Sequence, residues 1–222
     1  MIRYDRGFSL VEMAIVLVII GVLIGGLVTP FSTQLEAGKR KAVESQLRDI
    51  NEALVGFAAS TGRLPCPATT ASNGLSAPNA ATLVCTGFDG YVPVRTLGLN
   101  GSVDANDLLL DPWLNPVRYR LSSSNGGAYA SNITLGMVPD IRTCADSACV
   151  TVLADTVVAV VYSTGDDGTA TTSADQLENL DGDTTFVKRG FSEATGAEFD
   201  DHLVWISPNT LTYQLVRAGQ LN

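Results

Sequence analysis

The N-terminal stretch from Gly7 to Pro30 constrains this chain more than any other part of it. Between Glu12 and Glu36 lie 23 residues without a charge, and most of those up to Val28 are aliphatic. At ~1.5 Å per residue, such a helix is long enough to cross a ~30 Å hydrocarbon core. We therefore predict a membrane span over residues 8–30. A carboxylate such as Glu12 is costly in an apolar span, which marks it as functional.

The residues around the start of the span do not fit a secretory signal peptide. Such a peptide has a shorter apolar core followed by a small-residue cleavage site. Here the apolar tract is longer, and a leader of seven residues with Arg3 and Arg6 precedes it. The sequence Gly-Phe-Ser-Leu-Val-Glu at residues 7–12, followed by an apolar helix, resembles the leader of type IV prepilins and of the pseudopilins of type II secretion.

This resemblance implies a processing step and an assembly device. A prepilin peptidase would cut between Gly7 and Phe8 and methylate the new amino terminus. In a filament, the Phe8 ammonium of one subunit would pair with the Glu12 carboxylate of a neighbour, since a desolvated and unpaired carboxylate is costly. The implied partners are this peptidase, other pilin or pseudopilin subunits and an inner-membrane assembly platform. The implied location is the inner membrane, single-pass, with a periplasmic C-terminal domain that reaches a filament or the cell surface after assembly.

The helical pattern continues beyond the span. Apolar residues at Val43, Leu47, Ile50, Leu54 and Phe57 are spaced by four and three, which predicts one buried stripe. We predict a helix from about residue 9 to residue 59, ending before a glycine. The chain then divides into a leader over 1–7, a transmembrane and assembly helix over 8–30, an amphipathic continuation over 31–61 and a periplasmic pilin-like globular domain over 62–222.

The remainder of the chain predicts a small sheet. Residues 62–106 are rich in turn residues and predict loops. Strands are predicted at 117–121, 157–162 and 203–207, a helix at 210–218, and an acidic insertion at 163–201. The fold class is α+β, with a long N-terminal helix packed on a small antiparallel sheet. This arrangement is type IV pilin-like. Residues 111–120, beginning Asp-Pro-Trp-Leu-Asn-Pro, resemble a segment of the major pseudopilin.

Four cysteines indicate an oxidising compartment and two disulfides, with three connectivities open. We favour Cys66 with Cys85 and Cys144 with Cys149, because the second pair is close enough to close a small loop. Zinc is the competing interpretation, but the chain has one histidine and no C-x2-C spacing.

The acidic insertion suggests a cation. Residues 163–168 read Ser-Thr-Gly-Asp-Asp-Gly, and further acids follow at 175, 178, 181 and 183. Calcium binds six to eight oxygens of this kind. The segment resembles the calcium loop of the major pseudopilin, where Asp167 matches the first ligand and Asp175 one member of an acidic pair. Ala174 stands at the other member's position. Calcium is thus the candidate cofactor, and a solvated acidic loop is the alternative.

Other chemistry has less support in the sequence. The formal net charge of -9 argues against a nucleic-acid partner. We interpret the basic run at residues 39–41 as a solvated helix face near lipid headgroups. His202 beside Asp200 and Asp201 could act as a base, but the sequence has no nucleophile motif to accompany it. We therefore predict that the protein is not an enzyme.

The favoured function is a structural subunit of a type IV pilus-like filament or a type II secretion pseudopilus, polymerised through its N-terminal helix. The segment at 111–120 and the acidic loop favour a pseudopilin. The chain length and the residues after that loop favour a minor pilin with an adhesion, priming or DNA-uptake role. An alternative of another class is a membrane-anchored periplasmic binding module or enzyme.

Overall fold

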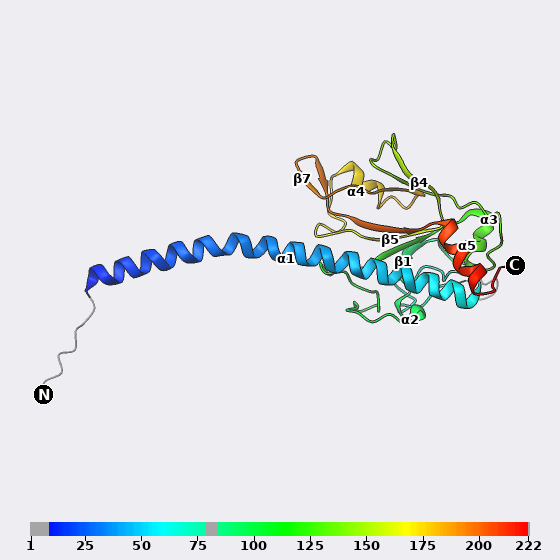
Figure 1. The fold of residues 1–222 in the computed structure, drawn as a ribbon, viewed down its shortest axis with the longest axis horizontal. Helices are drawn as coiled ribbons and strands as arrows, with labels where there is room; N and C mark the ends of the chain where they lie inside the picture. The colour runs from blue at the N-terminus through cyan, green and yellow to red at the C-terminus, as the bar shows by residue number, and fades with distance from the viewer. Residues whose placement is uncertain (1–8, 79–83, 222) are drawn as a thin grey trace, which may run out of the picture. The chain divides into compact units, whose positions relative to one another are not determined.

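The computed structural model describes residues 9–78 and 84–221, without the side chains of residues 24–32 (Figure 1). Backbone contacts divide the chain into two compact units, Met1–Lys41 and Ala42–Asn222. The long helix α1 (Leu10–Thr61) contributes to both units. Its bounds confirm the predicted helix to within two residues. Gly62 ends α1 because it adopts a left-handed backbone with φ 74°, and its N–H donates to the Ala58 carbonyl (2.8 Å).

In the second unit, α1 contributes one stripe to the core. Val43, Leu47, Ile50 and Leu54 are buried as predicted. The last member of the stripe is Ala58, not Phe57, because two steps of four residues from Ile50 keep a side chain on the same face of the helix. Phe57 is half-buried and lies under the Arg63 guanidinium, 5.6 Å from the ring centroid.

The main sheet of the second unit has four antiparallel strands. They are β1 (Asp89–Tyr91), β2 (Arg118–Leu121), β5 (Ala159–Ser163) and β9 (His202–Ile206), in the order β1-β2-β5-β9. Strands β2 and β9 confirm the segments predicted at 117–121 and 203–207 to within one residue. One core cluster joins the α1 stripe to Tyr119, Leu121, Val161 and Ile206 of this sheet.

A second sheet has the order β4-β3-β6. Its strands are β3 (Ile141–Cys144), β4 (Val152–Val157) and β6 (Thr185–Val187), and the β3–β6 pair is parallel. The prediction of one strand over residues 157–162 was wrong. Val157 pairs with Ile141 in this second sheet, whereas Ala159 pairs with Leu121 in the main sheet. The apolar run is therefore shared between two sheets. The expectation of a single antiparallel sheet was also wrong, because the second unit contains more than one sheet and one strand pair is parallel.

Strand β5 is buried on both of its faces, which explains why its sequence is apolar from Ala159 to Val161 and continues into the buried Tyr162. Ala159 and Val161 belong to the cluster that contains the α1 stripe. Val160 and Tyr162 belong to a second cluster with Ile141 of β3 and residues of β6 and β9. The second unit thus has three layers: α1, the main sheet and the second sheet (Figure 1).

Smaller elements complete the second unit. They are α2 (Val94–Leu97), α3 (Ser124–Gly127), the 3-10 helix η1 (Ala128–Ala130), α4 (Ala174–Glu178), the hairpin of β7 (Ser192–Ala194) and β8 (Ala197–Phe199), and α5 (Pro208–Arg217). The predicted C-terminal helix is confirmed as α5, which begins two residues earlier than expected. Its first residue is Pro208, and Ser207 caps the helix by accepting the Thr210 N–H (3.1 Å). The acidic insertion contains α4, β6, β7 and β8.

Candidate functional site

The N-terminus of α1 is closed by a reciprocal capping box. The Ser9 N–H donates to Glu12 Oε2 (2.8 Å), and the Glu12 N–H donates to Ser9 Oγ (3.2 Å). The pattern Ser-x-x-Glu could have predicted this role of Glu12 from sequence, but our prediction assigned Glu12 to assembly alone. The predicted processing residues Gly7 and Phe8 lie outside the described residues.

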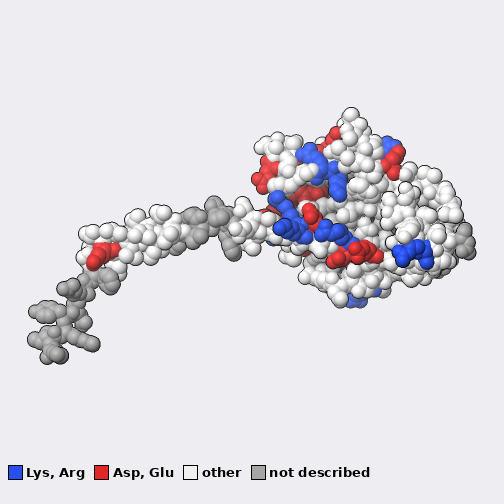
Figure 2. All heavy atoms as spheres, viewed as in Figure 1, with Lys and Arg blue, Asp and Glu red and all other residues white. Residues whose placement is uncertain are grey.

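The part of α1 that follows this capping box presents its apolar side chains outward. Every residue from 9 to 23 is exposed, with fractions between 87% for Leu10 and 45% for Ile20 among the large apolar side chains. Glu12 is the only charged residue of this segment, and Figure 2 shows the described part of the N-terminal helix as mostly white up to the grey, undescribed part. Among the described residues, no helix meets the length and hydropathy expected of a membrane span.

Two loops of the second unit are held together through Asp111. This buried carboxylate accepts the Asn115 N–H (2.9 Å) and the Ser163 hydroxyl (2.5 Å). In return, Asn115 Nδ2 donates to the Gly165 carbonyl (2.6 Å). Burial raises the pKa of Asp111 above its ordinary value. The segment at 111–120 and the loop after β5, which both carried a resemblance in the sequence, therefore lie side by side.

Asp200 organises the loop after β5. Its Oδ2 accepts the N–H groups of Asp166 (2.6 Å) and Asp167 (3.2 Å), and its Oδ1 accepts from Gln176 Nε2 (2.5 Å). Gly165 has φ 62°, and any Cβ at this position would overlap the Asp200 carboxylate. Burial, together with the neighbouring Asp200, raises the pKa of Asp167 to about 6. The central role of Asp200 was missed from sequence, where it was considered only beside His202.

The structure does not bring the two predicted calcium ligands to one site. Asp167 contacts the side chains of Gln176, Asp200 and Thr171. Asp175 instead accepts the Ser147 N–H on Oδ1 (2.9 Å) and forms an ion pair with Arg189 through Oδ2 (2.6 Å). Because a guanidinium and a backbone N–H occupy its oxygens, Asp175 does not fit the ligand set that calcium requires.

A different acidic group does cluster in the insertion. One ligand oxygen from each of Glu178, Asp181 and Asp183 lies within 4.8 Å of the others, and this is the one such group of three among the described residues. Asp181 and Asp183 are exposed and accept backbone N–H groups two residues further on. These local turns explain the cluster without an ion.

Both disulfides connect the residues that the sequence favoured. Cys66 is joined to Cys85 with 5.3 Å between the Cα atoms, and Cys144 is joined to Cys149 with 5.1 Å between them. The described chain has no unpaired cysteine. The second disulfide closes the turn between β3 and β4, whose Ser147 N–H binds Asp175.

The histidine lies beside an aromatic ring. His202 stacks on Trp113 with 5.8 Å between the ring centroids, at the first position of β9. Its neighbour Asp201 is buried and accepts from Asn179 Nδ2 (2.7 Å). Asp200 and Asp201, which the sequence analysis considered beside His202 without predicting catalysis, accept hydrogen bonds from Gln176 and Asn179.

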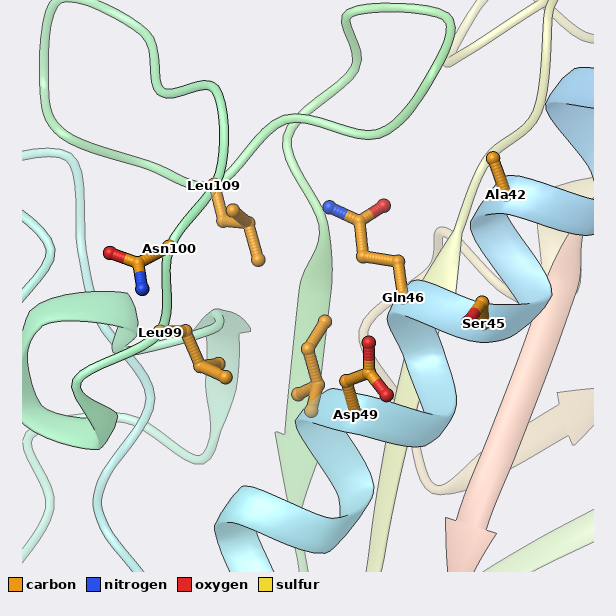
Figure 3. Close-up of a pocket in the computed structure, with 8 residues that line it drawn as sticks. Ala42, Ser45, Gln46, Asp49, Leu99, Asn100 and Leu109 are labelled. Atoms are coloured by element: carbon orange, nitrogen blue, oxygen red, sulfur yellow. The ribbon is translucent and has the colours of Figure 1, made fainter.

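An open pocket of about 440 Å³ lies beside the polar face of α1 in the second unit (Figure 3). Leu99 and Leu109 project into it from the loop side, and Gln46 and Asp49 line it from α1. The Gln46 amide donates to the Leu110 carbonyl (2.9 Å) and so joins helix to loop. On the face shown in Figure 2, acidic and basic groups are interspersed over this unit, with no continuous basic surface.

Comparison with known proteins identifies the N-terminal segment. Residues 2–28 match the family described as the prokaryotic N-terminal methylation motif. The chain therefore carries the prepilin-type signature of type IV pilins and pseudopilins, and this confirms the resemblance seen in the sequence. The motif implies processing by a prepilin peptidase and membrane-anchored assembly with other pilin subunits in general. Searches of curated proteins and of solved structures give no match.

Proposed function

We propose that this protein is a structural subunit, and not an enzyme, of a type IV pilus-like filament or a type II secretion pseudopilus. It would be anchored in the inner membrane of a Gram-negative bacterium by its N-terminal helix and extracted into the filament after processing. The observation that carries this proposal is the prepilin-type signature at residues 2–28.

The surface of the N-terminal helix supports this role. Apolar side chains are exposed around the whole circumference of α1 from residue 10 to residue 23. Exposed apolar area costs about 25 cal/mol per Å² relative to its burial. Such a continuous apolar surface requires a cover, which lipid would supply before assembly and the helices of other subunits after it.

The position of Glu12 is compatible with both stages. In the single chain, the Ser9 N–H occupies Oε2 of its carboxylate. Cleavage after Gly7 would create an ammonium at Phe8, and Oε1 of a neighbouring Glu12 could accept it. The charge pair would then satisfy two groups that are costly to bury singly.

The finer assignment that we favour is a pseudopilin. The support is the clamp through Asp111, which joins the segment at 111–120 to the Ser-Thr-Gly-Asp-Asp-Gly loop. Both segments resemble the major pseudopilin in sequence. A minor pilin with an adhesion, priming or DNA-uptake role is the second candidate, because the insertion after this loop adds α4 and strands β6 to β8 to the domain.

The amino terminus of the protein purified from its native membrane tests the proposal. We expect a chain that begins at N-methylated Phe8, and an unprocessed chain in a host without prepilin peptidase. A second arm compares filament assembly of two variants, Glu12→Ala and Glu12→Gln. The Gln variant keeps an oxygen for the capping box but loses the charge, so both variants should lose assembly.

Glu52→Ala is the matched control, because it removes an exposed acid from the same helix in the second unit. It should leave assembly unchanged. An intact Met1 in both hosts, together with normal membrane insertion of both Glu12 variants, would instead indicate an anchored periplasmic binding module or enzyme.

A further inference from the structure

The loop after β5 has the acids of a calcium site but a different arrangement of donors. We propose that the buried amide of Gln176 closes this loop in place of a cation, so that the fold of this protein does not depend on calcium. The inference is independent of the filament role.

Gln176 is placed to do this by burial and by two hydrogen bonds. Gln176 is 1% exposed and lies in the middle of α4. The Gln176 Oε1 accepts the Thr171 hydroxyl (2.5 Å), and its Nε2 donates to Asp200 Oδ1 (2.5 Å). The Gln176 amide therefore links both Thr171, at the end of the loop, and the distant Asp200 carboxylate to α4. A bound cation would also hold such segments together.

Both oxygens of the Asp200 carboxylate beside this amide are already occupied. Asp200 accepts two backbone N–H groups on Oδ2 and the Gln176 amide on Oδ1. The side chain of Asn115 supplies a second neutral donor, to the Gly165 carbonyl (2.6 Å). The orphaned oxygen in this loop is Asp167 Oδ1, which is buried without a hydrogen-bond partner. Calcium is bound by several carboxylates together with carbonyl and water oxygens, whereas the buried side chains of this loop leave one carboxylate oxygen without a partner.

The acid that should complete a calcium site is bound elsewhere. Asp175 pairs with Arg189 (2.6 Å), whose Nη2 also donates to the Ala197 carbonyl (2.5 Å). With the Ser147 N–H on its other oxygen, Asp175 connects the disulfide turn of β3 and β4 to β8. It therefore stabilises the second layer of the domain, and the positions that flank Gln176 supply no further carboxylate to the loop.

The substitution that tests this inference is Gln176→Glu. It changes few atoms, but it removes the only donor that Gln176 offers to Asp200 and adds a carboxylate beside Asp167 and Asp200. Without a cation, these three acids would repel one another. With calcium, they would supply ligand oxygens. The variant should therefore acquire a calcium dependence that the natural chain lacks.

The experiment is thermal unfolding of the full chain in detergent, followed by tryptophan fluorescence, in excess EGTA and in millimolar CaCl₂. Trp113 is a suitable probe because its N–H donates to Asp111, and Asp111 also binds Ser163 at the start of the loop. We expect the midpoint of the natural chain to be the same in both solutions. Gln176→Glu should unfold about 5 °C lower in EGTA and recover in calcium.

Two further variants keep the inference testable if Gln176→Glu fails to fold. Gln176→Ala removes the amide without adding a charge, and should lower the midpoint equally in both solutions. Gln214→Glu makes the same chemical change on α5 and should show no calcium effect. A natural chain that is stabilised by calcium relative to EGTA would overturn the inference, as would a Gln176→Ala variant as stable as the natural chain.

Discussion

At the scale of single residues, the second unit contains carboxyl groups whose environment favours the protonated form. Asp201 is the clearest case, because its side chain is buried and interacts with Asn179, Asp200 and Asp167. Burial raises the pKa of Asp201 to about 8, and the two nearby carboxylates add to the effect. Asp167 belongs to the loop after β5, and Asp200 binds the backbone of this loop. The pH dependence of stability should therefore originate largely in this region.

The pH dependence has a definite sign. A carboxyl group with a pKa of about 8 in the folded chain and about 4 in the unfolded chain holds its proton only when folded, between these two values. Its contribution to stability is therefore complete below about pH 4 and is lost as the pH rises through about 8. We expect the free energy of unfolding to fall over this range, and to fall less steeply in Asp201→Asn.

Urea unfolding at a series of pH values measures this slope directly. The asparagine keeps an oxygen to accept the Asn179 amide, so the variant should remain folded. Asp181→Asn, which changes an exposed acid of the same insertion, should retain the slope of the natural chain. Equal slopes in the natural chain and Asp201→Asn would show that Asp201 is ionised in the folded protein.

At the scale of elements, the two disulfides stabilise different parts of the second unit. Cys66 and Cys85 are 19 residues apart and both lie between α1 and β1, whereas Cys144 and Cys149 are 5 residues apart and enclose one turn. The loop-closure estimate gives about 3 kcal/mol for the first and about 2 kcal/mol for the second. The described residues between α1 and β1 belong to no helix or strand, so this segment depends more on its covalent link.

We expect replacement of Cys66 and Cys85 by alanine to lower the free energy of unfolding more than replacement of Cys144 and Cys149. Urea denaturation of the two double variants under non-reducing conditions makes the comparison. Each variant retains the other disulfide and serves as its control. If the variant without Cys144 and Cys149 were the less stable, the turn between β3 and β4 would contribute more than its loop length implies.

At the scale of the whole molecule, the two units depend on different environments. All buried apolar residues that the structure describes lie between Val43 and Leu221, within the second unit. The described side chains of the first unit are exposed or half-exposed. The buried core that the structure describes therefore contains no residue of the first unit, whereas the exposed apolar side chains of residues 9–23 need an apolar surrounding.

A fragment that begins at Ala42 should consequently fold alone in water. We expect its thermal midpoint to lie within about 3 °C of the midpoint of the full chain in detergent, since a loss of 1 kcal/mol shifts a domain of this size by about 2–4 °C. Calorimetry of both proteins tests this. A fragment that begins at Leu54 would lose three buried positions of the α1 stripe and should not fold.

The sequence by itself determined the features that depend on residues close together in the chain. The signature at residues 2–28, the limits of α1 and the stripe from Val43 to Leu54 all follow from local pattern and periodicity. The strands β2 and β9 and the helix α5 were also predicted, because each has its own alternation or cap. The disulfide pairs agree with the sequence preference, which rested on the short spacing of Cys144 and Cys149.

Only the tertiary structure decided how the apolar run at 157–162 is shared between two sheets, and which donors the acids of the insertion bind. Gln176 and Asp166 reach Asp200 across 24 and 34 residues, and Ser147 reaches Asp175 across 28. A carboxylate can accept a hydrogen bond from an amide or a guanidinium, or can bind a cation, and the residues next to it in the sequence do not decide among these partners. The partner depends on which segments the core brings together. That choice is made by the packing of β5 between α1 and the second sheet.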